Sequence, residues 1–339
     1  MEEEELAVTE REKRRVAVVG ARGHVGVELL RIVLRHPCFE PAFAASRSLA
    51  GQRVQDHVAG APEDLLFEDL PADEAASRGA DAWILALPNG MSESYVEAIS
   101  RRAPHAVIVD VSADHRFDAQ WQYGVPELFR DRVQNSHRIA NPGCYATGMQ
   151  LALWPIRGLL VAPPVIFGVS GYSGAGATPS ERNDPDRLHD NLLAYQLVGH
   201  VHEREVSRHL GMSVHFTPHV AQFFRGISLT IALTFGEEQS AAGLGRRYSE
   251  QYGGEPLVRI TAAPPEIRDV RGTPAIAIGG IAVAAGGRRG VVVAALDNLL
   301  KGAASQAIQN LNLACGFDEL TGLIAPAARG AEPPAARRG

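Results

Sequence analysis

Residues 15–34 read RVAVVGARGHVGVELLRIVL, and this stretch decides the fold of the first half of the chain. It begins with a short β-branched run that predicts a strand, and it ends with the apolar spacing of an amphipathic helix. The turn between them places glycines at every third position, Gly20, Gly23 and Gly26. Strand, glycine turn and helix in this order are typical of a dinucleotide-binding unit, in which backbone N–H groups approach a pyrophosphate at the start of the helix.

The G-x-x-G-x-x-G spacing of this turn is a variant of the usual G-x-G-x-x-G form, so a purely structural glycine turn is the alternative interpretation. The flanking strand and helix favour nucleotide binding. We therefore predict that the cofactor contacts the turn through Gly20, Arg22, Gly23, His24, Val25 and Gly26.

The residues after the second predicted strand, 40–45, indicate which dinucleotide is bound. Proteins specific for NAD usually carry Asp or Glu here, on the ribose hydroxyls, whereas this chain has Ser46 and Arg47. A hydroxyl and a guanidinium suit the 2′-phosphate of NADP. A solvated loop arginine is the alternative interpretation, and we favour NADP as the cofactor.

Two further apolar runs, residues 82–87 and 106–111, predict buried strands of the same sheet. Ligands bind beyond the carboxyl ends of the strands in open α/β sheets. We therefore expect Pro88 and Ser112, which follow these strands, to contact the cofactor. Arg116 stands slightly further on, where it could hold a phosphate or a carboxylate bidentately or could equally be a surface arginine.

A single cysteine stands at the start of another predicted helix. Residues 141–147 read NPGCYAT, and an apolar, helix-forming stretch follows to residue 153. Unpaired N–H groups and the positive end of the helix dipole favour the thiolate of Cys144, which is the form that attacks a carbonyl carbon. A buried structural cysteine is the alternative interpretation.

The segment 191–208 contains a candidate base. If this segment is helical, His202 and Glu205 lie one turn apart on one face, where the carboxylate can orient the imidazole and raise its basicity. His200 and His202 diverge on a helix, which argues against a metal pair, and we expect no metal. A solvated helix face with two ordinary histidines is the alternative interpretation.

The sequence pattern of the second half of the chain predicts an α+β domain. A polar segment at 178–190 predicts an irregular loop at the surface or at a subunit contact. A long amphipathic helix at 303–313 is expected to return to the first domain. The apolar runs between these features predict a largely antiparallel sheet with strands at 165–170, 214–218, 228–235, 259–262, 275–284 and 291–296.

The predicted fold class is therefore α/β, with a Rossmann-type doubly wound parallel sheet and an α+β substrate and dimerisation domain. The NADP-binding domain is expected to be discontinuous, covering residues 14–145 and 299–323, and the catalytic domain to cover 146–298. The acidic residues 1–13 and the Ala, Pro and Arg-rich residues 325–339 are expected to be disordered tails.

Composition limits the compartment and the partners. A formal net charge of -6 gives no basic field for nucleic acid or anionic membrane, and no apolar run approaches membrane-spanning length. The three cysteines form neither a disulfide framework nor a metal-ligand spacing, which fits a reducing compartment. We expect a cytoplasmic homodimer or homotetramer that binds small molecules.

A thiolate, a base, an NADP site and separate arginines together indicate reduction of an acyl group to an aldehyde through a thioester. On its motifs the chain resembles the N-acetyl-gamma-glutamyl-phosphate reductases, the NADPH enzymes of arginine biosynthesis, and more distantly the aspartate-semialdehyde dehydrogenases. The resemblance runs from about residue 15 to residue 323. It is carried by residues 20–26, 28–31, 45–48, 111–114, 124–128, 141–147, 216–219, 225–226 and 297–302.

The resemblance implies that Cys144 attacks the acyl phosphate and expels phosphate, that NADPH reduces the thioester, and that N-acetyl-glutamate 5-semialdehyde is released. It implies that His202, supported by Glu205, is the acid and base, with His200 as the reserve candidate. Further expected contacts are Ser170, Gly171 and Asn298 with the nicotinamide half of the cofactor, and Arg116, Asn141, His200, His219 and Arg225 with the substrate.

Other enzymes and one non-enzyme function remain as alternatives. The related reductase of the aminoadipate route to lysine is similar, but there we expect Ala-Gly-Cys-Asn rather than the sequence around Cys144. An aspartate-semialdehyde dehydrogenase fits the context of His202 less well. A catalytically silent NADP-binding regulator is the alternative from a different class. The chain departs from the usual pattern of the reductases at Asn89, Val201 and Pro274.

Overall fold

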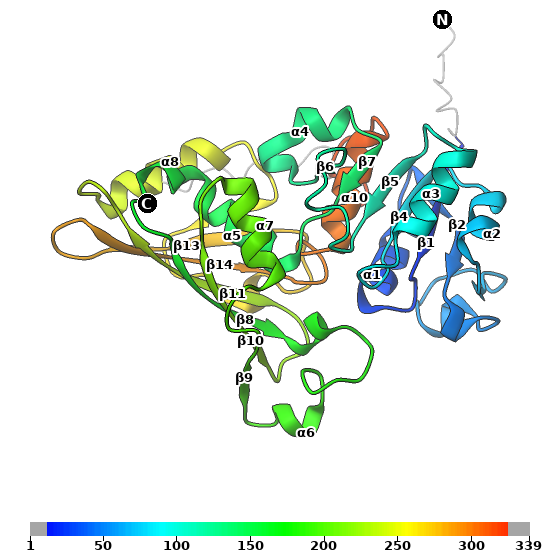
Figure 1. Cartoon of the computed structure of the whole chain (residues 1–339), viewed down its shortest axis with the longest axis horizontal. Helices are drawn as coiled ribbons and strands as arrows, with labels where there is room; N and C mark the ends of the chain where they lie inside the picture. Colours follow the sequence, from blue (N-terminus) through cyan, green and yellow to red (C-terminus); the bar gives the residue numbers. More distant parts are fainter. Residues whose placement is uncertain (1–11, 325–339) are drawn as a thin grey trace, which may run out of the picture.

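The computed structural model describes residues 12–324, so the predicted tails lie outside the described residues except for residues 12 and 13. The described chain forms two seven-stranded sheets, one in each half of Figure 1. Within this range no helix is both long enough and apolar enough to cross a membrane.

The first sheet is parallel throughout, in the strand order β3-β2-β1-β4-β5-β7-β6. As predicted, β1 (Arg14–Val19) passes through the glycine turn into α1 (His24–Val33). The strand order changes direction between β1 and β4, which is the switch point where such sheets bind ligands. The other strands are β2 (Phe39–Ala45), β3 (Phe67–Glu68), β4 (Ala82–Leu85), β5 (Val107–Asp110), β6 (Gln122–Tyr123) and β7 (Arg138–Ala140).

Helices cover both faces of this sheet. Alternate residues of β1 enter two separate apolar clusters, because successive side chains of a strand point to opposite faces. One cluster contains α2 (Ala72–Arg78) and α3 (Glu93–Arg102). The other contains α1 and the C-terminal helix α10 (Ala304–Ala314), which lies beside α4 (Pro126–Gln134) in Figure 1. The prediction of a doubly wound sheet is confirmed.

The second sheet has the order β12-β13-β14-β11-β8-β10-β9. Among the described strands, β8 pairs with β10 in parallel, and so does β12 with β13. The other neighbouring strands of this sheet are antiparallel. The prediction of a largely antiparallel sheet is therefore confirmed. The strands are β8 (Val165–Gly171), β9 (Leu192–Ala194), β10 (His215–Ala221), β11 (Ile227–Thr234), β12 (Val258–Thr261), β13 (Ile276–Val283) and β14 (Arg289–Leu296).

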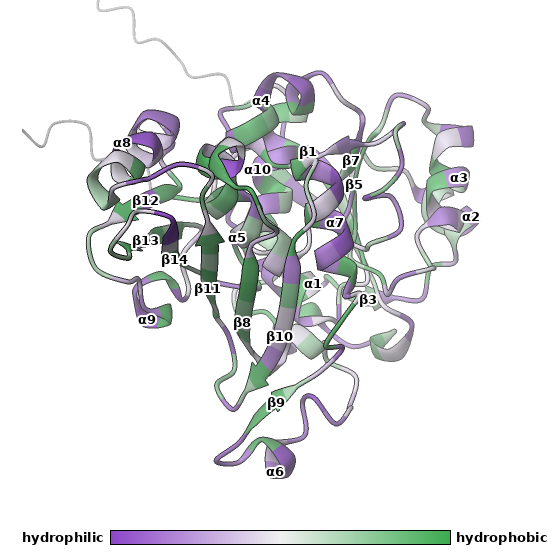
Figure 2. Cartoon of the chain, turned by 60° about the vertical axis from the view of Figure 1, so that its left-hand side comes forward, coloured by the Kyte–Doolittle hydropathy of each residue, from purple (hydrophilic) through white to green (hydrophobic). Residues whose placement is uncertain are grey.

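One face of the second sheet packs against α5 (Cys144–Leu153), α7 (Val201–Leu210) and α8 (Ala241–Tyr252) to form the core of this unit. The opposite face leaves Val165 and Phe167 of β8 exposed. As Figure 2 shows, β9 and the short helix that precedes it form an outlying end of the unit.

Two local predictions differ from the structure. The segment 178–190 is not wholly irregular, because it contains α6 (Pro185–Leu188), and the helix expected within 191–208 begins only at Val201. The remaining short helix is α9 (Ile267–Val270).

Candidate active site

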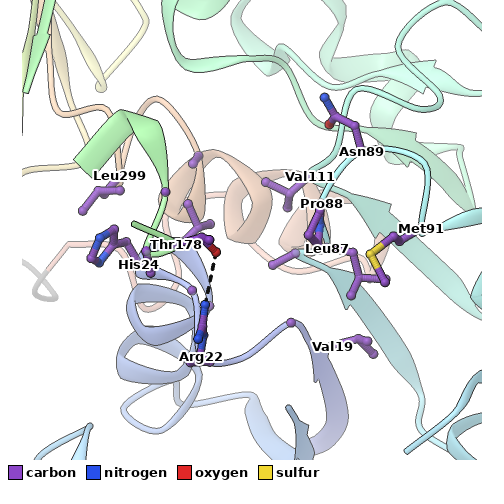
Figure 3. Close-up of a pocket in the computed structure, with 18 of the residues that line it drawn as sticks. Val19, Arg22, His24, Leu87, Pro88, Asn89, Met91, Val111, Thr178 and Leu299 are labelled. Atoms are coloured by element: carbon purple, nitrogen blue, oxygen red, sulfur yellow. Dashed lines mark hydrogen bonds between the residues drawn. The ribbon is translucent and has the colours of Figure 1, made fainter. Parts of the chain in front are cut away.

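A cleft of about 1070 Å³ opens at the carboxyl ends of β1, β2 and β4 and continues to the N-terminus of α5. The first sheet contributes the glycine turn and residues 45–48 and 86–89, and the second unit contributes residues 173–178. Figure 3 shows part of this cleft, where Arg22 of the glycine turn donates a hydrogen bond to Thr178 (3.4 Å). Both units therefore build the cleft.

All six residues of the glycine turn that were predicted to contact a cofactor line this cleft. Gly20 has φ of +84°, and a Cβ there would collide with the carbonyl group of Ala86. A Cβ at Gly26 would lie 2.5 Å from the carbonyl oxygen of Gly20. Helix α1 begins at an N-cap glycine, Gly23, and within the described chain no side chain caps it. Its first N–H groups can therefore receive a pyrophosphate, so the turn fits a dinucleotide.

The residues after β2 line the same end of the cleft. Ser46 is buried and Arg47 is exposed. Asp69 and Tyr95 also line this end, and the hydroxyl of Tyr95 donates to the carbonyl oxygen of Leu70 (2.7 Å). Sequence analysis missed Asp69 because β3, which precedes it, has only two residues and carries no strand pattern, whereas Tyr95 lies on α3 and does not follow a strand end.

Two further predicted cofactor contacts follow β4 and β5. Pro88 lines the cleft, as Figure 3 shows. Ser112 lies behind it, because its hydroxyl donates to Asp110 (2.8 Å) within a buried polar network that includes Ser92. The Ser112 side chain is therefore engaged by protein groups in this structure, and its contact with the cofactor stays a prediction.

Three functional groups converge at the start of α5. Cys144 is the first residue of the helix, is half-buried and lines the cleft. A Cβ at Gly143 would collide with Nε2 of His202 and would lie 2.7 Å from Nη1 of Arg116. Glycine is required before the cysteine because an imidazole and a guanidinium both approach this backbone.

The protonation state of the cysteine depends on its burial. Burial raises the pKa of the Cys144 thiol to about 11, and this effect exceeds the opposing effects of the Tyr145 backbone N–H and the Arg116 charge. Burial therefore opposes the thiolate that the start of the helix favours. A thiol at this position needs a base that removes its proton during attack.

His202 has the properties of such a base. Burial holds the pKa of His202 well below its usual value, and the charges of Arg116 and His200 lower it further. The imidazole is therefore neutral at neutral pH and can accept a proton. Its Nδ1 has no hydrogen-bond partner among residues 12–324, whereas its Nε2 faces Gly143.

Glu205 has partners other than His202. Its fully buried carboxylate accepts hydrogen bonds from the Tyr123 hydroxyl (2.6 Å) and the Gly143 N–H (2.9 Å) through Oε1. Through Oε2 it accepts one from Nη1 of Arg116 (3.1 Å). The prediction that Glu205 orients the imidazole is therefore wrong: it holds the loop before Cys144 and the guanidinium instead.

Arg116 is buried at the edge of the cleft, where its Nε donates to the carbonyl oxygen of Asn141 (2.9 Å) and its Nη2 to that of Val111 (2.8 Å). Asn141 was expected near the leaving phosphate. Its side-chain amide instead donates to the carbonyl oxygen of Ala303 (3.2 Å) and accepts from Asn310 (3.0 Å), behind the cleft. Asn141 therefore supports the nucleophile loop, and its predicted contact with the phosphate stays a prediction.

Of the three residues predicted to contact the nicotinamide half of the cofactor, Asn298 lines the cleft. Its amide donates to Ser173 (2.9 Å). Ser170 donates to the carbonyl oxygen of Gly171 (2.9 Å), and a Cβ at Gly171 would lie 2.5 Å from the carbonyl oxygen of Phe224. Ser170 and Gly171 therefore serve the packing of the loop behind the cleft, and their contacts with the cofactor stay a prediction.

His200 is the N-cap of α7, and its Nδ1 accepts a hydrogen bond from the N–H of His202 (3.1 Å). Burial lowers the pKa of His200 to about 4, and the nearby charge of Arg182 contributes to this. His200 is buried behind His202 rather than in the cleft lining. His200 therefore helps to fix the start of α7 and with it His202, and its contact with the substrate stays a prediction.

His219 and Arg225 also lie away from the cleft lining. The ring of His219 packs on Phe167 at the outer face of the second sheet, with 4.3 Å between ring centroids. Arg225 donates to Glu28 of α1 (3.0 Å) and to Asp297 (3.0 Å), so it joins the two units. In this structure both side chains contact protein groups, and their substrate contacts stay a prediction.

Several residues of the Cys144 end were not predicted individually. The lining there includes Ser173, Gly174, Arg182 and Gly302. A Cβ at Gly302 would lie 2.7 Å from Cβ of Cys144, so this glycine lets the two loops meet. The run of small residues 171–177, which includes Ser173 and Gly174, indicated a loop that can approach a ligand closely. Nothing in the sequence pattern indicated a role for Arg182.

Comparison with known proteins defines the class. The chain matches the family described as "Semialdehyde dehydrogenase, NAD binding domain" over residues 15–136 and the one described as "Semialdehyde dehydrogenase, dimerisation domain" over 144–298. A solved structure of aspartate semialdehyde dehydrogenase II from Vibrio cholerae covers 90% of this chain and 99% of its own, with a TM-score of 0.73 at 16% identity. The enzyme from Candida albicans, solved with NADP, covers 89% and 100%, with a TM-score of 0.65 at 15% identity. The chain is an oxidoreductase of the semialdehyde dehydrogenase class and has a domain for a nicotinamide cofactor.

Relatives of higher identity define the family within this class. The chain is 52% identical over 308 residues to N-acetyl-gamma-glutamyl-phosphate reductase of Xanthomonas campestris pv. campestris (strain B100), covering 91% of this chain and 98% of that protein. It is 52% identical to the protein of that name from Stenotrophomonas maltophilia (strain R551-3), with 91% and 97% covered, and 48% identical to that from Xylella fastidiosa (strain M23), with 91% and 94% covered. The chain belongs to the N-acetyl-gamma-glutamyl-phosphate reductase family, as its motifs predicted.

Proposed function

We propose that this chain catalyses the NADPH-dependent reductive dephosphorylation of N-acetyl-gamma-glutamyl phosphate to N-acetyl-glutamate 5-semialdehyde, a step of arginine biosynthesis. The shared name of the relatives supports the substrate. The observation that carries the chemistry is the convergence of Cys144, His202 and Arg116 at one end of the cleft that starts at the glycine turn.

In the first half-reaction, Sγ of Cys144 attacks the acyl carbon and the thiol proton passes to Nε2 of His202. The C–S bond forms, the bond from the acyl carbon to the phosphate oxygen breaks, and phosphate leaves with its electron pair. The position of His202 supports this division of roles, since its Nε2 faces Gly143, the residue before Cys144, and its neutral imidazole is free to accept a proton. Arg116, beside Gly143, stabilises the departing negative charge.

In the second half-reaction, the thioester is reduced to a thiohemiacetal. NADPH, when bound, supplies the hydride for this step. His202 then returns its proton as the thiohemiacetal collapses, so that the aldehyde leaves and the Cys144 thiol is restored. The glycine turn and Asn298 line the same cleft as Cys144, which supports binding of the nicotinamide within reach of the thioester.

The cofactor proposal predicts a selective effect of Arg47→Ala. Loss of charge-assisted hydrogen bonds to the 2′-phosphate should weaken NADPH binding by roughly 10- to 100-fold and leave NADH binding nearly unchanged. Fluorescence titration with both cofactors measures this. Arg53→Ala is the matched control, because Arg53 is an exposed arginine that pairs with Asp56 outside the cleft lining. Equal losses for NADPH and NADH would refute the 2′-phosphate assignment.

The substrate proposal is tested in the reverse direction, by following phosphate-dependent reduction of NADP. We expect N-acetyl-glutamate 5-semialdehyde to exceed both its one-carbon-longer homologue and aspartate semialdehyde by at least about 10-fold in kcat/KM, as one methylene in a fitted pocket allows. Turnover of the longer homologue alone would indicate that the chain is instead the related reductase of lysine biosynthesis. Tight NADPH binding without turnover of any aldehyde would favour a regulator.

The proposed assembly is a homodimer or homotetramer in the cytoplasm. The match of residues 144–298 to a dimerisation domain supports an assembly, and so does the uncovered face of β8 with Val165 and Phe167. Light scattering of the purified chain measures the number of copies.

A further inference from the structure

Arg182 lines the Cys144 end of the cleft but has no part in the chemistry described above. It lies before α6 and is exposed, and its guanidinium carbon is 4.9 Å from the centroid of the Tyr195 ring. Among residues 12–324 no carboxylate forms a salt bridge with it, whereas Arg187 of the same segment pairs with Glu181 (3.1 Å). A cation that rests on an aromatic face and keeps its charge unpaired is suited to bind an anionic ligand.

Arg182 and the nucleophile border one cluster of rings. The Tyr195 ring lies 5.8 Å from that of His200, which lies 4.8 Å from that of His202. Tyr145, the residue after Cys144, is 5.9 Å from His202. Arg182 and Cys144 both line the cleft and both lie next to members of this ring cluster, so a substrate whose carbonyl reaches Cys144 can extend along the cleft toward Arg182.

The other arginines of the cleft lining are committed elsewhere. Arg22 and Arg47 belong to the glycine turn and to the loop after β2, at the nucleotide end. Arg116 lies beside Gly143, and its charge is paired with Glu205. Within the described part of the chain, Asp69 is the one carboxylate of the lining, and it lies at the nucleotide end. An anionic group at the far end of a substrate would therefore meet Arg182 without a competing carboxylate.

We propose that Arg182 binds the carboxylate that the substrate carries at the end opposite to its reacting carbonyl. Arg182 is then a specificity-determining residue, and the enzyme selects aldehydes and acyl phosphates that bear a distal carboxylate. Because Arg116 lies beside the loop of Cys144, the phosphate that leaves from the reacting carbon belongs to Arg116, and the distal carboxylate is left to Arg182. This inference rests on the proposed function, since it takes N-acetyl-glutamate 5-semialdehyde as the reference substrate.

The test compares two aldehydes that differ only in this carboxylate, N-acetyl-glutamate 5-semialdehyde and 4-acetamidobutanal. Arg182→Gln should lower kcat/KM for the first by roughly 10- to 100-fold through KM, as expected for a lost charge-assisted contact, and should leave the second unchanged. The KM for phosphate and that for NADP should not change. Arg182→Lys should restore part of the loss, and Arg187→Gln, which removes a neighbouring arginine outside the cleft lining, should behave as the wild type.

Other outcomes would overturn this assignment. Equal losses for both aldehydes would mean that Arg182 acts only by packing on Tyr195, and a raised KM for phosphate would make it a phosphate ligand. If the wild type does not oxidise N-acetyl-glutamate 5-semialdehyde, the proposed function fails. The same comparison is then made with aspartate semialdehyde and 3-aminopropanal. A loss confined to the carboxylate-bearing aldehyde still supports the role of Arg182, and an equal loss refutes it.

Discussion

Replacement of Cys144 by serine is expected to slow phosphate-dependent oxidation of the semialdehyde by at least about 1000-fold, while cofactor binding stays within about two-fold. A serine hydroxyl is a much weaker nucleophile than a thiol whose proton passes to His202. An oxygen ester also accepts hydride less readily than a thioester. Because Cys144 stands at the opposite end of the cleft from Arg47, the substitution leaves the cofactor contacts in place.

The matched control is Cys38→Ser. Cys38 is half-buried like Cys144, but its carbonyl oxygen accepts from the N–H of Arg14, at the end of β1 opposite to the glycine turn. This variant should retain full activity. Mass spectrometry after rapid quenching with the acyl phosphate and no NADPH should find an acyl adduct on Cys144 of the wild type. Substantial turnover by Cys144→Ser, or an adduct elsewhere, would contradict covalent catalysis through this residue.

The parts of the fold that sequence predicted are those that local periodicity specifies. Residues 15–34 predicted the strand, turn and helix because each feature depends on neighbours within a few positions. The same holds for α5, which begins at Cys144 after a Pro-Gly pair. The order of strands in the second sheet was less accessible. The segments 214–218 and 228–235 follow each other in sequence and run in opposite directions, yet β8 lies between β10 and β11.

The structure brings His202 and Arg116, two of the residues proposed from sequence, to the loop of Cys144, but sequence did not predict the contacts between the candidate residues. Helical spacing brought His202 and Glu205 to one face, but the partners of Glu205 come from residues 62 to 89 positions away. Those partners include a buried guanidinium, which forms a stronger interaction with a carboxylate than a neutral imidazole does. No local pattern could reveal this competition.

Motif residues also divide into those that reach the cleft and those that hold it together. Asn141 and Arg225 both belong to stretches that carried the family resemblance, yet their hydrogen bonds are to Asn310, Glu28 and other groups of the protein. A motif reports that a residue type is needed at a position, and it does not report whether the need is for a ligand or for packing. Arg182 is the converse case, since it lies in a polar segment without any pattern and still lines the cleft.

The role of Glu205 leads to the second large effect, in the variant Glu205→Gln. The substitution leaves the buried Arg116 without its charge partner, which should lower the free energy of unfolding by about 3 kcal/mol. Turnover should fall roughly 100-fold, because the Gly143 N–H and the guanidinium lose their fixed positions. Urea unfolding and steady-state kinetics measure the two effects. Glu203→Gln is the control on the same helix, since the Glu203 carboxylate accepts only from backbone N–H groups among the described residues.

Alkylation of Cys144 by iodoacetamide distinguishes two roles of Glu205: holding Gly143 and Arg116, as in the structure, or supporting the basicity of His202, as the sequence predicted. The negative charge of Glu205 is one of the causes that raise the pKa of Cys144, so its removal lowers that pKa. At about pH 8, below a pKa of about 11, a lower pKa increases the thiolate fraction. Alkylation should therefore become faster in Glu205→Gln even as turnover falls. If Glu205 instead acted only by supporting the basicity of His202, the thiolate fraction of Cys144 would not rise, and alkylation would keep the wild-type rate while turnover fell.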